Sequence, residues 1–216
     1  MSHRDGYPQG VPSWVDLQAK DQEVAKAFYS QLFGWELDDQ PLPMGGHYTM
    51  ASLDGGAVAG IGSAPPGGPE GMPSVWTTYF AVDDLADVLA KVEGAGGQVV
   101  MPAMAVMESG HMALVADPTG GIAGLWQANQ HRGAGTVNQH GALVWNELIT
   151  PDPDGAAAFY DAILGTTHET GPMGGDGDYT VINVDGRSVA GAMALPEHQG
   201  VPTAWTVYFA TDDIDA

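Results

Sequence analysis

Trp14-Val15-Asp16-Leu17, with Ala27-Phe28-Tyr29 and Gly34 after it, decides the fold because the same pattern returns 131 residues further along the chain. The second copy reads Trp145-Asn146-Glu147-Leu148, Ala158-Phe159-Tyr160 and Gly165. Two later stretches repeat as well: Tyr48-Thr49 as Tyr179-Thr180, and Tyr79-Phe80-Ala81 as Tyr208-Phe209-Ala210. A match spread over so much of the chain predicts a duplicated folding unit.

The residues inside one copy predict a strand, a helix and three more strands. Residues 12–19 alternate, with Val15 and Leu17 on one face and Trp14, Asp16 and Gln18 on the other, which is the period of a strand. Asp21 is placed to cap a helix, and Gly34 to end it. Short strands are expected near 35–39, 47–53 and 57–63.

A second unit of the same kind begins at 75–82. Asp83 and Asp84 predict the start of a helix that runs to Val92, and strands are expected near 98–101, 111–117 and 121–127. Pro65-Pro66-Gly67-Gly68-Pro69 is expected to link the two units. The predicted fold class is therefore α+β, built from tandem βαβββ modules that pair into a half-barrel.

The repeat also sets the expected domains: 9–128 as a complete first domain, 129–140 as a linker and 141–216 as a second domain. Ala216 aligns with Asp87, so the second domain is expected to be an incomplete copy that lacks the counterpart of residues 88–127. We expect a truncated product whose function lies in the first domain. The alternative is a homodimer, in which one chain covers the open second-domain face of another.

Composition excludes several classes of protein. The 216 residues carry 27 acidic side chains against 6 Lys plus Arg, a formal charge of −21, which disfavours nucleic-acid and membrane-surface partners. The absence of Cys excludes disulfides and cysteine nucleophiles. No apolar run approaches a membrane span of about 20 residues, so a cytoplasmic location is expected. The charge is typical of a highly soluble protein or of adaptation to high salt.

The chain resembles the vicinal-oxygen-chelate superfamily, which groups glyoxalase I, bleomycin-resistance proteins and extradiol dioxygenases. The resemblance rests on the paired modules, on the helix exit at 27–35 and on Ala116-Asp117-Pro118-Thr119-Gly120-Gly121. It is strongest to two-domain actinobacterial glyoxalase-like proteins of the culture-filtrate-antigen and hydroxylase type. Because one scaffold carries many reactions, it predicts the fold more firmly than the chemistry.

The resemblance implies a divalent metal held by His and Glu on the first and last strands of paired modules. The corresponding positions here are Trp14, Thr77 and Gly124, with the fourth-strand position among residues 58–61. None of these offers an imidazole or a carboxylate, so we expect no metal and no other cofactor. The seven histidines show no metal-binding spacing, and His111 is the one expected near a cavity, at its rim beside Glu108.

A cavity lined by aromatic side chains takes the place of the metal in this interpretation. The expected substrate-binding residues share the cavity-facing side of their strands: Trp14, Thr77, Tyr79 and Trp126 in the first domain, Trp145 and Tyr208 in the second. Trp14 and Trp145 serve either as packing that fills the space of a lost metal or as a stacking wall for a ligand. Trp76, Trp205, Phe80 and Phe209 fall on the opposite, helix-packing face.

Asp16 and its repeat partner Glu147 are the candidate catalytic residues. A partly desolvated carboxylate on the cavity face gains a raised pKa and can act as a general base, or it can be a buried acid satisfied by Tyr79 or a backbone amide. The sequence therefore predicts a protein that binds a small apolar or aromatic molecule without the metal. The alternative is an atypical lyase, isomerase, dioxygenase or hydroxylase-type enzyme that uses Asp16 or Glu147 as proton carrier.

Overall fold

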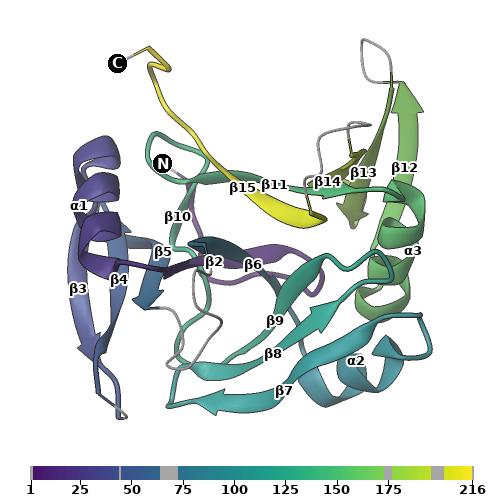
Figure 1. Cartoon of the computed structure of the whole chain (residues 1–216), viewed down its shortest axis with the longest axis horizontal. Coiled ribbons are helices and arrows are strands. Elements are labelled where there is room, and N and C mark those ends of the chain that lie inside the picture. Colours follow the sequence, from purple (N-terminus) through teal and green to yellow (C-terminus); the bar gives the residue numbers. More distant parts are fainter. Residues whose placement is uncertain (1, 44, 64–72, 173–176, 196–201, 216) are drawn as a thin grey trace.

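The computed structural model describes residues 2–43, 45–63, 73–172, 177–195 and 202–215 (Figure 1). The proline-glycine stretch 65–69, predicted to link the first two modules, lies outside the described residues. Both modules follow the expected order of strand, helix and three strands. The first consists of β2 (Pro12–Ala19), α1 (Gln22–Phe33), β3 (Glu36–Pro41), β4 (His47–Leu53) and β5 (Gly56–Ser63). The second consists of β6 (Val75–Ala81), α2 (Leu85–Val92), β7 (Gln98–Val106), β8 (Gly110–Ala116) and β9 (Ile122–Ala128).

The helix boundaries confirm the capping residues read from the sequence. The Asp21 side chain accepts from the Val24 amide at the start of α1, and Gly34 closes the helix in the left-handed conformation with φ 70°. Asp84 caps α2 in the same way by accepting from the amide of Asp87. These local signals work because each cap satisfies backbone groups that the helix leaves without a partner.

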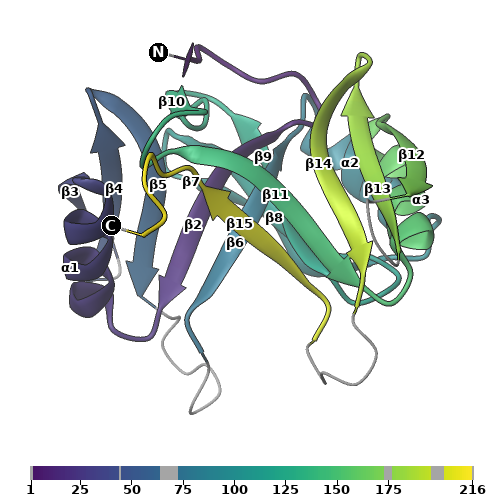
Figure 2. The same cartoon turned by 90° about the horizontal axis from the view of Figure 1, so that it is seen from above.

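The two modules join edge to edge into one sheet of eight strands among the described residues. Its order is β3-β4-β5-β2-β6-β9-β8-β7, with β2 and β6 antiparallel at the centre. Each module places its first and last strands side by side and parallel, β2 with β5 and β6 with β9. The sheet is curved, and α1 and α2 lie at opposite ends of the molecule (Figure 2).

A third module forms most of a second sheet. It consists of β11 (Leu143–Thr150), α3 (Pro153–Leu164), β12 (Thr167–Pro172), β13 (Asp178–Val184) and β14 (Arg187–Ala194). Strand β15 (Ala204–Phe209) pairs antiparallel with β11, as β6 does with β2. The short strands β1 (Ser2–His3) and β10 (Thr136–Val137) complete this sheet. The α+β class and the repeated module are thus confirmed.

The segment 129–140, expected as a linker, packs into the fold along much of its length. Ala134 and Val137 are buried, and the Ala134 amide donates to the Ser13 carbonyl on β2. The hydroxyl of Tyr7 donates to the Ala134 carbonyl at 2.6 Å. These contacts bring the segment against the first sheet, where it contributes to the site described below.

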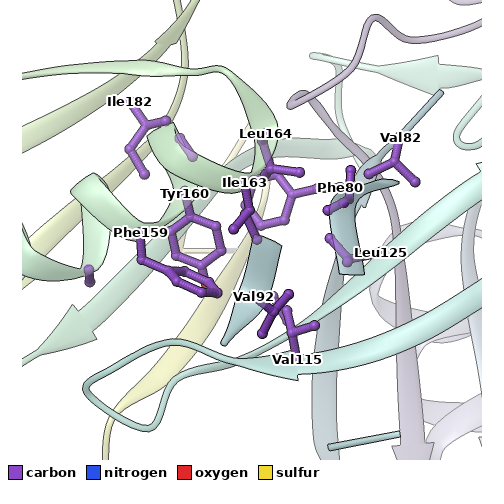
Figure 3. Packing of buried hydrophobic residues seen from close by; sticks show 14 of the residues in the cluster. Phe80, Val82, Val92, Val115, Leu125, Phe159, Tyr160, Ile163, Leu164 and Ile182 are labelled. Atoms are coloured by element: carbon purple, nitrogen blue, oxygen red, sulfur yellow. The ribbon is translucent and has the colours of Figure 1, made fainter. Parts of the chain in front are cut away.

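The largest buried cluster is shared between the second and third modules. Phe159, Tyr160 and Ile163 of α3 pack against Val92 of α2 and Phe80 of β6 (Figure 3). Figure 1 shows α2 and α3 side by side. Because apolar burial stabilises in proportion to the area removed from water, this cluster holds the two sheets together.

The large aromatic residues predicted to face the helices do so. Trp205 is buried against Phe80 and Tyr160, and its indole N–H donates to the Tyr160 hydroxyl at 2.9 Å. Trp76 packs beside Phe209, and its N–H donates to Tyr29 on α1. Within the described residues, none of the helices is both long and apolar enough to cross a membrane.

Candidate functional site

Strand β2 presents alternate side chains to the two faces of the sheet, as its sequence predicts: one face packs on α1 and the other lines a cavity. Val15 and Leu17 are buried against Ala25 and Tyr29 of α1. Trp14 and Asp16 line a cavity on the other face of the sheet. A strand turns successive side chains to opposite faces, so this one element supplies both core and site.

The cavity has a volume of about 410 Å³, enough for a molecule of two or three fused rings. Both modules of the first sheet contribute to its wall. Its aromatic lining is Trp14, Tyr48, Tyr79, Trp126 and His131; its methionines are Met50, Met104, Met107 and Met112; the rest is Asp16, Gln18, Gln40, Leu42, Val106 and Ser109. The wall is therefore mainly apolar, with few polar groups.

Four of these side chains form a hydrogen-bonded network centred on Asp16. The indole N–H of Trp14 donates to the Tyr48 hydroxyl at 3.0 Å. Tyr48 and Tyr79 each donate to Oδ2 of Asp16, at 3.3 and 3.2 Å. We call Trp14, Asp16, Tyr48 and Tyr79 the Asp16 cluster.

Asp16 is buried, with only 6% of its surface exposed. Burial raises its pKa to about 6, although the hydrogen bonds from Tyr79 and Tyr48 and the nearby Gln18 side chain oppose the rise. Its second oxygen, Oδ1, is buried without a hydrogen-bond partner among the described residues. Burial, followed by the nearby Asp16 charge, raises the pKa of Tyr48 and Tyr79 well above the usual range, so both remain hydrogen-bond donors. The sequence interpretation of Asp16 as an acid that Tyr79 satisfies thus describes one of its two oxygens.

Trp14 is buried, as packing requires, and it also lies at the cavity. It is only 4% exposed and belongs to a buried cluster with Tyr79 and Trp126. It is also part of the cavity wall. The ring of His131 meets it edge-on, with ring centroids 4.3 Å apart.

His131 is one of the cavity residues that sequence reasoning missed. It lies just beyond β9, in the stretch interpreted as a linker, and its carbonyl accepts from the indole N–H of Trp126 at 2.8 Å. Burial lowers its pKa to about 4, so the ring is neutral at pH 7. His111, the histidine expected at the rim, is exposed on β8 and does not line the cavity, because it points to the opposite side from its neighbour Met112.

Of the other site residues predicted in the first domain, two line the cavity and one does not. Tyr79 and Trp126 line the cavity, as expected for their faces. Thr77 lies opposite Asp16 on β6 and is half-buried, but it does not line the cavity. β9 pairs with β6 from Tyr79 to Ala81, so Thr77 lies before the part of β6 that pairs with β9.

The third module carries a second copy of the network. Trp145 donates to Tyr179 at 2.8 Å, and Tyr179 and Tyr208 donate to Glu147 at 2.8 and 2.7 Å. We call these four residues the Glu147 cluster. Glu147 is buried, whereas Tyr208 is 41% exposed. None of the four lines the 410 Å³ cavity; Trp145 instead borders a space of about 120 Å³ beside Tyr7 and Asn146.

Comparison with known proteins places the chain in a family. Residues 12–123 match the model of the Glyoxalase/Bleomycin resistance protein/Dioxygenase superfamily. "Putative glyoxylase CFP32" of Mycobacterium tuberculosis is 52% identical over 217 residues, covering 100% of this chain and 83% of that protein. The chain belongs to the glyoxalase/bleomycin resistance protein/dioxygenase superfamily. "Anthracycline biosynthesis protein DnrV" of Streptomyces peucetius is 36% identical over 221 residues, covering 97% of this chain and 80% of the relative.

A solved superfamily structure supports the fold. The Mn(II)-bound glyoxalase from Novosphingobium aromaticivorans superimposes with a TM-score of 0.63 over 95% of this chain and 67% of its own, at 16% identity. At that identity the likeness is one of fold.

The residues present do not fit the metal that such superfamily members hold. A Cβ built on Gly60 would overlap the hydroxyl of Tyr48, and one built on Gly124 would overlap the ring of Tyr79. The two tyrosines therefore fill the space above the fourth- and last-strand positions where the resemblance places ligands. Among the described residues, no three His, Asp or Glu side chains gather in a group that could hold a metal ion.

The repeat contained a signal for Tyr48. Tyr48 and Gly60 recur as Tyr179 and Gly191, and a Cβ on Gly191 would likewise overlap the hydroxyl of Tyr179. The sequence showed that these residues recur. It did not show that β4 lies two strands from β2, which brings Tyr48 to Asp16.

Proposed function

We propose that this superfamily member binds a small aromatic molecule in the cavity of the first sheet and does so without a divalent metal. The observation that most directly supports this proposal is the cavity. It has a volume of about 410 Å³ and is lined by Trp14, Trp126 and four methionines, and the Asp16 cluster lies where the resemblance places the metal. Methionine adapts its shape to a ligand and contacts aromatic rings favourably, which suits a planar guest.

One of the relatives, DnrV, is consistent with this proposal. DnrV is named for anthracycline biosynthesis, so a 36% identical protein is associated with polycyclic aromatic compounds. The cavity is large enough for part of such a ring system.

Calorimetric titration of the purified chain with 1-naphthol tests the binding. We expect saturable binding with one site per chain. Met112→Trp, which places an indole in the cavity, should weaken binding at least tenfold. Val100→Trp, at an exposed position on the neighbouring strand β7, is the matched control and should leave the affinity unchanged.

The metal-free state needs its own measurement. Native mass spectrometry with elemental analysis should find less than about 0.1 equivalent of Mn, Fe, Ni or Zn per chain, and affinity for 1-naphthol should survive chelation. One equivalent of metal, lost together with binding, would contradict the proposal.

A second candidate function is proton transfer by Asp16. The observation that favours it is a buried carboxyl with a pKa of about 6 on a residue that lines a mainly apolar cavity. Such a group accepts a proton near neutral pH. An atypical lyase or isomerase of this kind would lose turnover in Asp16→Asn while it kept ligand affinity, whereas a binding protein has no turnover to lose.

A further inference from the structure

Four of the six methionines that the structure describes line the cavity of the first sheet. Two of them face each other across neighbouring strands, because Met104 on β7 pairs with Met112 on β8. Met107 lies in the turn that joins these two strands, and Met50 lies on β4. Because the chain contains no Cys, methionine thioethers are its only sulfur groups. Much of the apolar lining of the cavity is therefore oxidisable.

The four methionines differ in how far solvent reaches them. Met104 is 47% exposed and Met107 is 56% exposed, whereas Met50 and Met112 are half-buried. The strand that carries Met104, β7, is an edge strand of the sheet. Because Met104 and Met107 line the cavity and remain exposed, they form part of its solvent-facing wall. A dissolved oxidant therefore reaches these two side chains more readily than the half-buried pair.

Oxidation changes what these side chains offer to a ligand. The thioether sulfur supplies the electron pair of a new S–O bond to one oxygen of hydrogen peroxide, and the O–O bond breaks. The hydroxide that leaves takes the proton of the transferred oxygen and becomes water, so sulfur is oxidised and peroxide is reduced. The product, methionine sulfoxide, is polar where the thioether is apolar. An apolar ligand that covers the sulfoxide oxygen removes it from water without supplying a hydrogen bond, which is unfavourable.

We propose that Met104 and Met107 are a modification site, at which sulfoxidation by hydrogen peroxide weakens the binding of an apolar aromatic ligand in the cavity. Methionine sulfoxide reductases reverse this modification, so the apolar wall can be restored. The inference rests on the proposed function, because it concerns the same cavity, and it adds a chemical control of ligand binding.

Peptide mass spectrometry after treatment with dilute hydrogen peroxide tests where the chain is oxidised. Met104 and Met107 should each gain one oxygen atom before Met193, which is half-buried on β14 and does not line the cavity. Saturating 1-naphthol should slow the oxidation of Met104 and Met107 but not that of Met193, because the ligand covers the cavity wall. Oxidation of Met193 ahead of both cavity residues would overturn the proposal.

Calorimetric titration after removal of the peroxide tests the effect on binding. The chain with Met104 and Met107 converted to sulfoxides should bind 1-naphthol at least about tenfold more weakly than the untreated chain. Equal affinities before and after conversion would count against this inference alone. If the untreated chain does not bind 1-naphthol, the proposed function fails and the inference falls with it.

The double variant Met104→Leu/Met107→Leu assigns the effect to these two residues. Leucine is apolar and of similar volume, and it cannot form a sulfoxide. The readout is the ratio of the affinities before and after peroxide within each protein, which allows for any change in the starting affinity. This ratio should be about one in the double variant and at least about tenfold in the matched control Met193→Leu. A tenfold loss in the double variant, or no loss in Met193→Leu, would overturn the proposal.

A second pair of variants needs no peroxide. Met104→Gln places a polar amide at the position where the sulfoxide would form, whereas Met104→Leu keeps the position apolar. Met104→Gln should bind 1-naphthol several-fold more weakly than Met104→Leu, because the ligand then covers a polar group. Equal affinities of the two variants would show that polarity at this position does not control binding, which would overturn the proposal.

Discussion

Asp16 and His131 line the same cavity, and burial shifts their pKa values in opposite directions. The pKa of Asp16 rises to about 6, and that of His131 falls to about 4. In both cases burial disfavours the charged form. Neither Asp16 Oδ1 nor His131 Nε2 has a hydrogen-bond partner among the described residues. Burial of these polar groups thus disfavours folding, and such perturbed groups are typical of functional sites.

These shifts predict opposite dependences of stability on pH. Asp16 has a higher pKa folded than unfolded, so its contribution is present below pH 4 and is lost as the pH rises to about 6. His131 has a lower pKa folded than unfolded, so its contribution is present above about pH 6.5 and is lost as the pH falls to about 4. In the wild type the two largely offset each other between about pH 4 and 6.

Urea unfolding at several pH values between 4 and 7 separates the two groups. Relative to the wild type, Asp16→Asn should gain stability as the pH rises from 4 to 6, by up to about 3 kcal/mol. His131→Gln should lose stability, relative to the wild type, over a similar range and by a similar amount. Parallel curves for all three proteins would show that neither group titrates abnormally.

At the scale of elements, the glycines of β5 and β9 leave the space that the two tyrosines of the Asp16 cluster occupy. Gly60 pairs with Asp16, and Gly124 pairs with Tyr79. The missing side chains leave room for the Tyr48 hydroxyl and the Tyr79 ring. The Asp16 cluster therefore depends on two strands that contribute no polar side chain to it.

Alanine at either glycine should disturb the cluster. In Gly124→Ala the new Cβ requires the buried Tyr79 ring to move, and in Gly60→Ala it displaces the Tyr48 hydroxyl from Trp14 and Asp16. We expect each to lower the free energy of unfolding by about 1–3 kcal/mol, measured by urea denaturation. Gly171→Ala on β12, where a Cβ meets nothing within 4 Å, is the control and should change stability by less than about 0.5 kcal/mol.

At the scale of the whole molecule, a shared core and a large negative charge act against each other. The cluster of α2, α3 and β6 joins the two sheets. The formal charge of −21 on 216 residues crowds many carboxylates onto a small protein, and their mutual repulsion opposes the compact state.

Added salt should therefore stabilise the fold. Between roughly 0.05 and 1 M NaCl the Debye length falls from more than 10 Å to about 3 Å, so repulsion between surface carboxylates is screened. The melting temperature should climb over this range. Sucrose at matched osmolality, which does not screen charge, should give a smaller increase, and a flat or falling curve in NaCl would contradict the expectation.

Local patterns in the sequence determined the modules. The alternation along β2, the caps at Asp21 and Asp84 and the repeat itself all lie within contiguous residues, where strand and helix periods are encoded directly. They were enough to predict the βαβββ order, the helix-facing side of Trp76 and Trp205, and the cavity-facing side of Trp14, Asp16 and Tyr79.

Only the tertiary structure decided how the site is completed. Tyr48 reaches Asp16 from two strands away, His131 packs against Trp14 from beyond β9, and Thr77 does not line the cavity. The two clusters likewise differ in a way that only the structure shows: both tyrosines donate to one oxygen of Asp16, whereas they divide between the two oxygens of Glu147. These contacts join residues far apart in the chain, so they depend on strand order, register and packing, which no local period specifies.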